Sequence, residues 1–170
     1  EADESDGSFL KFSPAIAVVT NIDREHLDYY QDLEAIKAVF LDFIDRIPFY
    51  GLAILCLDNE SIQDLIPKIK KRYITYGMSS QADFQIRDVV SEKRRSRFSV
   101  YRQGQKLGRI ILNLPGIHNV YNATASIAVG LELDVPMDAI ESALHTLEGV
   151  QRRLEIKGEI NGITVVDDYG

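Results

Sequence analysis

The sequence predicts an α/β fold in which helices flank a mostly parallel central sheet, with an additional antiparallel β-hairpin region. Two short apolar runs, 15–19 and 52–57, have the continuous character of strands that are buried on both faces. A helical repeat of apolar residues separates them, and strands that alternate with helices form parallel sheets. Between residues 82 and 113 polar and apolar residues alternate, which is typical of antiparallel strands with one exposed face.

The first half of the chain has a β-α-β-α-β pattern. After the first strand, Asp32 is a candidate N-cap for a helix whose apolar residues recur at helical spacing until Pro48 ends it. The second strand is followed by a helix that is interrupted near Pro67 and by a third strand at 73–76. We therefore expect three parallel strands joined by crossover helices.

The second half begins with the alternating segment, where apolar residues on both sides of Gln103-Gly104-Gln105 predict a hairpin. Two helices follow, one over 118–131 with Asn119 as a candidate cap and one that starts around Pro136. Near the end, two short apolar stretches surround Asn161-Gly162, a dipeptide typical of two-residue hairpin turns. The sheet is therefore predicted to be mixed.

Composition indicates one globular domain and excludes several function classes. The 170 residues are 45% hydrophobic and 26% charged, which suffices for a single core. The net charge of −7 argues against a nucleic-acid partner, because phosphate backbones are normally met by basic faces. No apolar run is long enough to cross a bilayer, and the acidic start is unlike a secretory signal. We expect a cytoplasmic protein with neither a nucleic-acid nor a membrane partner.

The single cysteine and the chain ends allow two further expectations. Cys56 lies in an apolar strand, so we expect a buried thiol without a reactive role. The chain starts in an acidic cluster without Met and stops directly after an apolar strand. We therefore expect a fragment of a longer protein.

Two acidic segments are candidates for a metal site. Residues 1–6 supply several carboxylates, and residues 23–28, which include His26, follow a strand at the end where open α/β sheets bind ligands. Carboxylates with one imidazole suit Mg²⁺, a hard cation that bridges phosphate oxygens. A solvated acidic turn with a helix-capping Asp is the alternative, and the residues alone favour it.

A loop that enters a helix and an arginine pair are candidates for nucleotide contacts. Asn119 and Asn122 lie at the helix start, where backbone N–H groups are unpaired, and an asparagine amide can both donate to and accept from a purine edge. Asn119 could equally be an N-cap alone. Arg152 and Arg153 could clamp phosphate or form surface ion pairs. No Gly-x-x-x-x-Gly-Lys-Ser/Thr phosphate loop occurs in the sequence.

Five segments, taken in order, resemble the Mur ligase family, and within it the branch that joins L-alanine to UDP-N-acetylmuramic acid. They are EADESD (1–6), TNIDREHLD (20–28), PGIHNVYNA (115–123), RRLE (152–155) and VDDYG (166–170). The resemblance implies the central, P-loop-NTPase-like ATP-binding domain over residues 1–170. It also implies that the phosphate-binding loop lies upstream of Glu1 and that Gly170 lies at the hinge to a C-terminal domain.

The resemblance also implies roles for individual residues and a reaction. Glu1 and His26 match positions that hold Mg²⁺ near the ATP γ-phosphate, and Asn119 and Asn122 match the pair around the adenine. One of the arginines at 152–153, preferably Arg153, matches a catalytic residue that reaches the phosphates, with Arg152 beside the nucleotide. The residue that matches the ribose-binding acid is Asp168. The implied reaction is ATP-dependent amide formation in bacterial peptidoglycan synthesis, with UDP-N-acetylmuramic acid and L-alanine as substrates.

Two points define the alternatives. Sibling ligases carry a carbamylated lysine where this chain has Phe40, with Lys37 one turn earlier, which favours the alanine-adding branch. One alternative is a related ligase of peptidoglycan recycling, which shares the chemistry. The other alternative is a nucleotide-binding module without catalytic activity. Because the phosphate loop is missing from the sequence, we expect residues 1–170 alone to be inactive.

Overall fold

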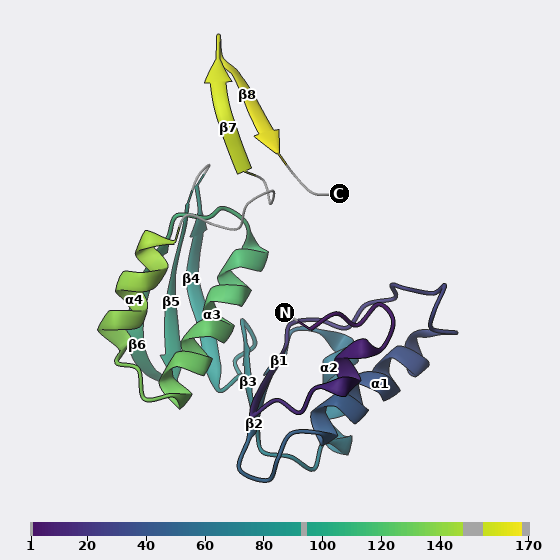
Figure 1. Cartoon of the computed structure of the whole chain (residues 1–170). Helices are drawn as coiled ribbons and strands as arrows, with labels where there is room; N and C mark the ends of the chain where they lie inside the picture. Colours follow the sequence, from purple (N-terminus) through teal and green to yellow (C-terminus); the bar gives the residue numbers. More distant parts are fainter. Residues whose placement is uncertain (1, 93–94, 148–154, 168–170) are drawn as a thin grey trace.

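The main body of the protein is a six-stranded mixed sheet with helices on it, as the computed structural model shows (Figure 1). The structure describes residues 2–92, 95–147 and 155–167. The strands follow one another in the sheet in chain order: β1 (Ile16–Val19), β2 (Leu52–Cys56), β3 (Tyr73–Gly77), β4 (Phe84–Ser91), β5 (Ser96–Arg102) and β6 (Gln105–Leu112). A separate hairpin of β7 (Glu155–Ile160) and β8 (Ile163–Asp167) follows.

The sheet has a parallel half and an antiparallel half. β1, β2 and β3 pair in parallel, as predicted from the alternation of strands and helices along the chain. β4 pairs in parallel with β3 at only two positions, Tyr76 with Phe84 and Gly77 with Gln85, and then continues beyond it. β5 and β6 add to β4 in antiparallel order. The predicted hairpin region is thus confirmed, and it extends the central sheet through β4, a strand that the sequence did not separate.

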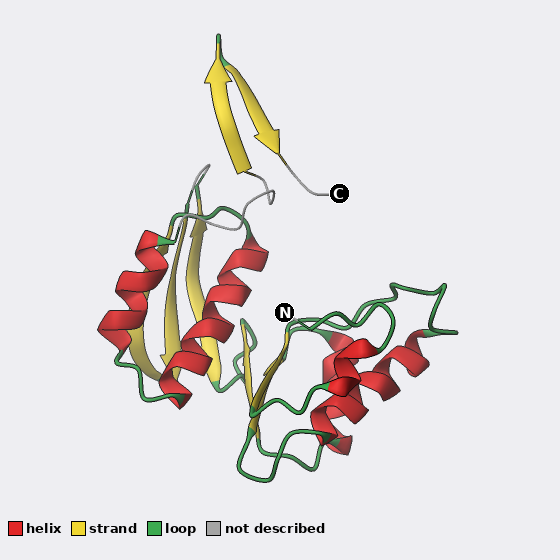
Figure 2. Cartoon of the chain, in the orientation of Figure 1, coloured by secondary structure: helices red, strands yellow, loops and turns green. Residues whose placement is uncertain are grey.

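The helices lie over different parts of the sheet (Figure 2). They are α1 (Leu33–Asp45), α2 (Glu60–Leu65), α3 (Ile117–Glu132) and α4 (Met137–Thr146), with short 3₁₀ helices η1 (Ser8–Lys11) and η2 (Ile66–Lys68). α4 packs on β6, whereas α3 contacts β2, β3, β4 and β5. The buried face of α3, which includes Val120 and Ile127, therefore packs on both halves of the sheet.

The helix boundaries confirm two predicted signals and correct one. The side chain of Asp32 caps α1 by accepting from the Ala35 N–H at 2.8 Å, and the helix after β2 changes to 3₁₀ geometry at Pro67. Asn119 as the cap of α3 is wrong, because the helix begins at Ile117 after Gly116. Gly116 has a φ of +96°, which an L side chain rarely adopts, so the chain turns into the helix there.

The predicted Asn161-Gly162 turn, the turn after β5 and the buried cysteine are confirmed. Asn161 and Gly162 both have positive φ, as a type I′ hairpin turn requires, and so do Gln103 and Gly104 between β5 and β6. Cys56 is buried, and burial raises the pKa of its thiol. Across the described ranges, no helix has the length and apolar character to cross a membrane.

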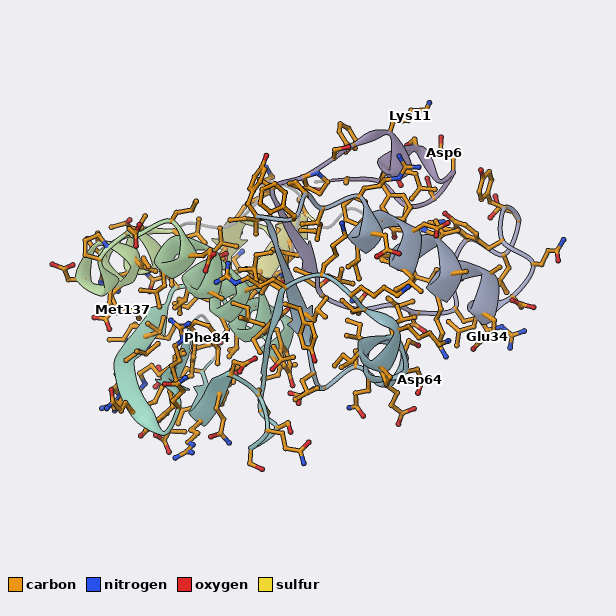
Figure 3. All side chains as sticks on the ribbon, turned by 90° about the horizontal axis from the view of Figure 1, so that it is seen from below. Asp6, Lys11, Glu34, Asp64, Phe84 and Met137 are labelled. Atoms are coloured by element: carbon orange, nitrogen blue, oxygen red, sulfur yellow. The ribbon has the colours of Figure 1, made fainter. Side chains whose placement is uncertain are left out.

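A charged contact joins the two helices of the parallel half. Lys37 on α1 is buried at 8% exposure, and its ammonium donates to Glu34 at 2.9 Å and to Asp64 on α2 at 2.8 Å. Figure 3 shows the two carboxylates on adjoining helices. Phe40, one turn later, packs its ring against Phe9 at 5.3 Å between centroids. Position 40 is therefore a partly buried apolar residue packed against the core, and Lys37 connects α1 to α2.

Candidate functional site

The described candidate residues lie along the same edge of the sheet. Because β1, β2 and β3 are parallel, their carboxyl ends meet at the same edge, where open α/β sheets bind ligands. The loop after β1 carries His26, and α3 begins at the same edge. That position is shown by Tyr121 of α3, whose hydroxyl donates at 2.7 Å to Asp58 in the loop after β2.

His26 occupies a left-handed backbone position in its loop. Its φ is +55°, and its carbonyl accepts from the N–H groups of Tyr29 and Tyr30, both at 2.9 Å. The imidazole is about one-third exposed, and its Nε2 lies 3.5 Å from Oε1 of Glu4. The Tyr30 hydroxyl donates to the Glu4 carbonyl, so the acidic N-terminal segment folds against the His26 loop. An imidazole and a carboxylate thus face one another at the carboxyl edge.

The other carboxylates of the acidic segment have local roles. Asp3 accepts from the Ser5 N–H and Asp6 from the Ser8 N–H, and these hydrogen bonds lower the pKa of both carboxyls. Glu4 is therefore the described carboxylate that faces the imidazole, and sequence reasoning did not single it out. The pattern carries no signal that separates Glu4 from its acidic neighbours. Glu1, the predicted metal ligand, lies outside the described residues.

The described residues offer few donor groups for a metal ion. They contain no group of three or more His, Cys, Asp and Glu side chains that could hold a metal ion. Mg²⁺ usually keeps several waters and takes one or two protein carboxylates together with phosphate oxygens. The pair of His26 and Glu4 fits that limited donor set, because both side chains reach solvent.

Asn119 and Asn122 share one face of the first two turns of α3. Residues three apart on a helix are neighbours on its surface. The Asn119 amide donates at 2.6 Å to the Pro115 carbonyl, which orients the amide and leaves its oxygen available. Asn122 is exposed, and in the described part of the chain its amide has no hydrogen-bond partner. The Asn122 carbonyl accepts from the Ser126 hydroxyl at 3.0 Å, whereas its side-chain amide is available to a ligand.

The remaining predicted site residues rest on the sequence motifs alone. Arg152, Arg153 and Asp168 lie outside the described residues, as Glu1 does. The β7–β8 hairpin lies between these positions in the sequence, and the roles inferred for them stay predictions.

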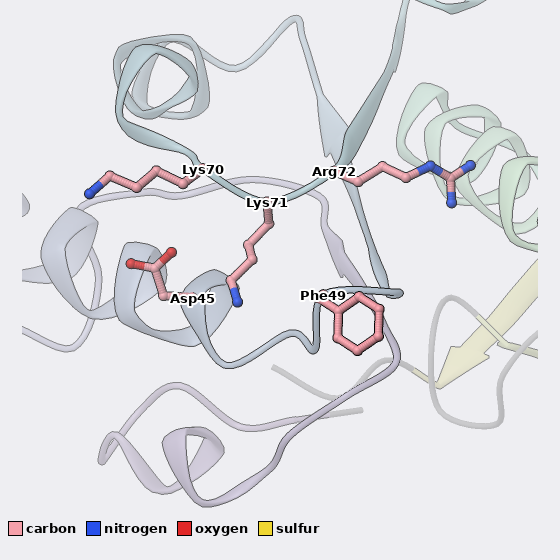
Figure 4. Close-up of a pocket in the computed structure, with 5 residues that line it drawn as sticks. All are labelled: Asp45, Phe49, Lys70, Lys71 and Arg72. Atoms are coloured by element: carbon pink, nitrogen blue, oxygen red, sulfur yellow. The ribbon is translucent and has the colours of Figure 1, made fainter.

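Two surface hollows lie at opposite ends of the parallel strands. The larger, about 510 Å³, is at the amino end of β3 and is lined by Asp45, Phe49, Lys70, Lys71 and Arg72 (Figure 4). Two of its cations already have structural partners, since Lys71 donates to the Ile47 carbonyl and Arg72 pairs with Glu132. The smaller, about 410 Å³, lies at the carboxyl edge and is lined by Leu57, Gln63, Ile66, Pro67, Ser79, Ser80 and Gln81. The candidate residues lie at the end with the smaller hollow. The direction of the parallel strands, and not the volume of a hollow, therefore indicates the candidate site.

Comparison with known proteins decides the family. A profile of the Mur ligase middle domain matches residues 1–130. The chain belongs to the Mur ligase family. It is 65% identical, over all 170 residues, to UDP-N-acetylmuramate--L-alanine ligase from Desulfatibacillum aliphaticivorans, of which it covers 37%. The predicted resemblance is thereby confirmed, and the chain spans just over a third of the length of such relatives.

Solved structures of Mur ligases share the fold. UDP-N-acetylmuramate-alanine ligase MurC from Thermotoga maritima superposes with a TM-score of 0.83 at 26% identity, over 100% of this chain and 38% of that one. UDP-N-acetylmuramate:L-alanyl-gamma-D-glutamyl-meso-diaminopimelate ligase from Neisseria meningitides superposes at 0.77 with 28% identity, over 89% of this chain and 48% of that one. The mixed sheet with flanking helices is thus the Mur ligase central fold, as the sequence predicted.

Proposed function

We propose that the chain is the ATP-binding part of a ligase that joins L-alanine to UDP-N-acetylmuramic acid in peptidoglycan precursor synthesis. The observation that carries this proposal is 65% identity, along the whole chain, to a relative with that name. The carboxyl edge supports it, because an imidazole, a carboxylate and two asparagines lie there beyond parallel strands.

The proposed reaction proceeds through an acyl phosphate. The carboxylate of the muramyl group attacks the γ-phosphorus of ATP, and ADP leaves. The alanine amine then attacks the acyl carbon, and phosphate leaves from a tetrahedral intermediate. Positioning and electrostatic stabilisation of the transferring phosphoryl group account for most catalysis in such reactions, so no side chain has to act as a nucleophile.

Each proposed residue has a binding or orienting role. His26, with Glu1 from the resemblance and Glu4 from the geometry, would hold Mg²⁺, which supplies positive charge next to the phosphates. Asn119 and Asn122 would bind the adenine edge, since an amide both donates and accepts. Arg153 would stabilise phosphoryl oxygens, with Arg152 beside the nucleotide and Asp168 at the ribose. The last three assignments, and that of Glu1, rest on the sequence motifs.

A phosphate-release assay on the full-length protein tests the proposal. We expect release that requires ATP, L-alanine and UDP-N-acetylmuramic acid together. Replacing L-alanine by the tripeptide L-Ala-γ-D-Glu-meso-diaminopimelate tests the recycling ligase, because release with the tripeptide alone would establish that alternative. Absence of release with either acceptor, together with retained ATP binding, would indicate a non-catalytic module. Residues 1–170 alone are expected to give no turnover.

A further inference from the structure

We propose that Tyr121 and Asp58 form a positioning pair that sets the rotation of α3, and thereby the direction of Asn119 and Asn122 at the adenine. The proposal rests on the function proposed above, in which these two asparagines bind the nucleotide base. Neither Tyr121 nor Asp58 is assigned a contact with a ligand. Their role is to hold the binding helix in one orientation.

Asp58 is held by two loops at the carboxyl edge. It follows β2, and its Oδ1 accepts from the Ser79 N–H at 3.0 Å while its Oδ2 accepts from the Met78 N–H. Both amides belong to the loop after β3. Gly77 allows this approach, since a Cβ added there would lie 2.7 Å from Oδ2 of Asp58. These hydrogen bonds fix the carboxylate relative to the ends of β2 and β3, and they do not involve α3.

Tyr121 connects α3 to this fixed carboxylate. Its hydroxyl donates to Oδ2 of Asp58 at 2.7 Å, across 63 positions of sequence. Burial, with a contribution from Asp58, raises the pKa of the hydroxyl, so it stays a donor throughout the physiological range. The Tyr121 ring also lies against Tyr76, with 6.5 Å between centroids. Removal of the hydroxyl alone would leave this ring contact in place.

The position of Tyr121 in the helix explains why the contact governs the asparagines. Successive helical residues are about 100° apart around the axis, so Tyr121 points away from the face that Asn119 and Asn122 share. The rest of the buried face is apolar, including Val120 and Ala123, except for Thr124, whose hydroxyl donates to the Val120 carbonyl of the same helix, and apolar packing is not directional. The hydrogen bond depends on angle as well as distance. The bond to Asp58 therefore joins the start of α3 to a different part of the fold and resists rotation of the binding face.

Substitution of Tyr121 by Phe in the full-length protein tests the pairing. We expect Tyr121→Phe to raise the KM for ATP about 3- to 10-fold, which is the range for one hydrogen bond, with kcat changed less than about twofold. Discrimination between ATP and inosine triphosphate should fall as well. The two nucleotides differ at the purine 6-substituent that an asparagine amide would recognise, and a merely structural defect would not change this ratio. Tyr73→Phe, the same change at an exposed ring on β3, is the matched control and should alter neither value.

Further variants separate this inference from the proposed function. If Asn119→Ala and Asn122→Ala both leave nucleotide affinity and discrimination unchanged, the proposed adenine site is wrong. If the asparagine variants lose affinity while Tyr121→Phe keeps the KM and the discrimination of the parent, the positioning role is wrong. Asp58→Asn should act in the same direction as Tyr121→Phe, and the double variant should be no worse than the more impaired single variant. Additive losses would show that the two residues act separately and would overturn the pairing.

Discussion

The parallel and antiparallel halves of the sheet differ in whether they carry candidate site residues. Around β1–β3, the candidate residues lie in loops beyond the strand ends, and one of them, His26, has a left-handed backbone. In β4–β6, the buried side chains Phe84, Phe98 and Ile110 face the helices, and we identify no candidate site residue within these strands. The two halves therefore have different proposed roles. Loops beyond the parallel strands would contact the ligand, whereas the antiparallel strands contribute side chains to the core. Helix α3 packs on both halves.

The N-terminal segment, which leads into the parallel half, and the antiparallel strands carry opposite net charges. Residues 1–32 contain eight Asp and Glu against two Lys and Arg, whereas residues 84–112 contain eight Lys and Arg against two Asp and Glu. The net charge of −7 conceals this division. A cation such as Mg²⁺ is favoured in the acidic region, which is also the region that contains His26.

The largest effect on stability is expected in the antiparallel half. Phe98 is 1% exposed in the core beneath the helices, so Phe98→Ala should lower the free energy of unfolding by about 3–5 kcal/mol. Calorimetry on the full-length protein measures the loss, and activity per folded molecule should be unchanged. Ile111→Ala, at a position 37% exposed in β6, is the control and should cost much less. A loss of catalytic rate without loss of stability at Phe98 would break the comparison.

The largest effect on activity is expected in the parallel half. His26→Asn should lower kcat by about 100-fold or more, which is the range for loss of one strong electrostatic contact in a transition state, while the melting temperature stays nearly constant. Asn is chosen because it tolerates the φ of +55° at this position. His145→Asn, an exposed histidine on α4, is the matched control. Equal losses of activity and stability at His26 would contradict a binding role.

A smaller, pH-dependent effect is expected at Lys37. Hydrogen bonding to Lys37 lowers the pKa of Asp64 below its ordinary value of 3.8. A depressed carboxyl pKa adds stability above the ordinary value, and this stability is lost as the pH falls through the folded-state value. Lys37→Met should therefore flatten the decline of melting temperature below about pH 4. Lys70→Met serves as the control, and an unchanged acid limb in Lys37→Met would show that the contact contributes no stability.

Much of the fold was predictable because its signals are local. The buried strands, the Asp32 cap, the break at Pro67 and the Asn161-Gly162 turn each depend on neighbours in sequence, and all are present. The register of β4 was not predictable, because two residue pairs with β3 decide it and no local pattern records them. The start of α3 was misjudged because Asn119 and Gly116 both suit a helix entrance, and the left-handed backbone at Gly116 decided it.

The candidate site was predictable in part. His26, Asn119 and Asn122 could be named from motifs, and the structure brings their segments to one edge of the sheet. The contact between Glu4 and His26 and the bond between Tyr121 and Asp58 join positions 22 and 63 residues apart, and such pairings depend on the tertiary fold. The sequence shows that Asp58 ends a strand, but no local pattern reveals that its carboxylate anchors a helix.

Amide hydrogen exchange of the full-length protein, with and without ATP and Mg²⁺, tests the division between the two halves most directly. The account predicts that nucleotide slows exchange in the loop over residues 20–32 and in the first turns of α3, while exchange in β4–β6 stays unchanged. Protection centred on β4–β6, or at the amino ends of the parallel strands around Lys70, would contradict it.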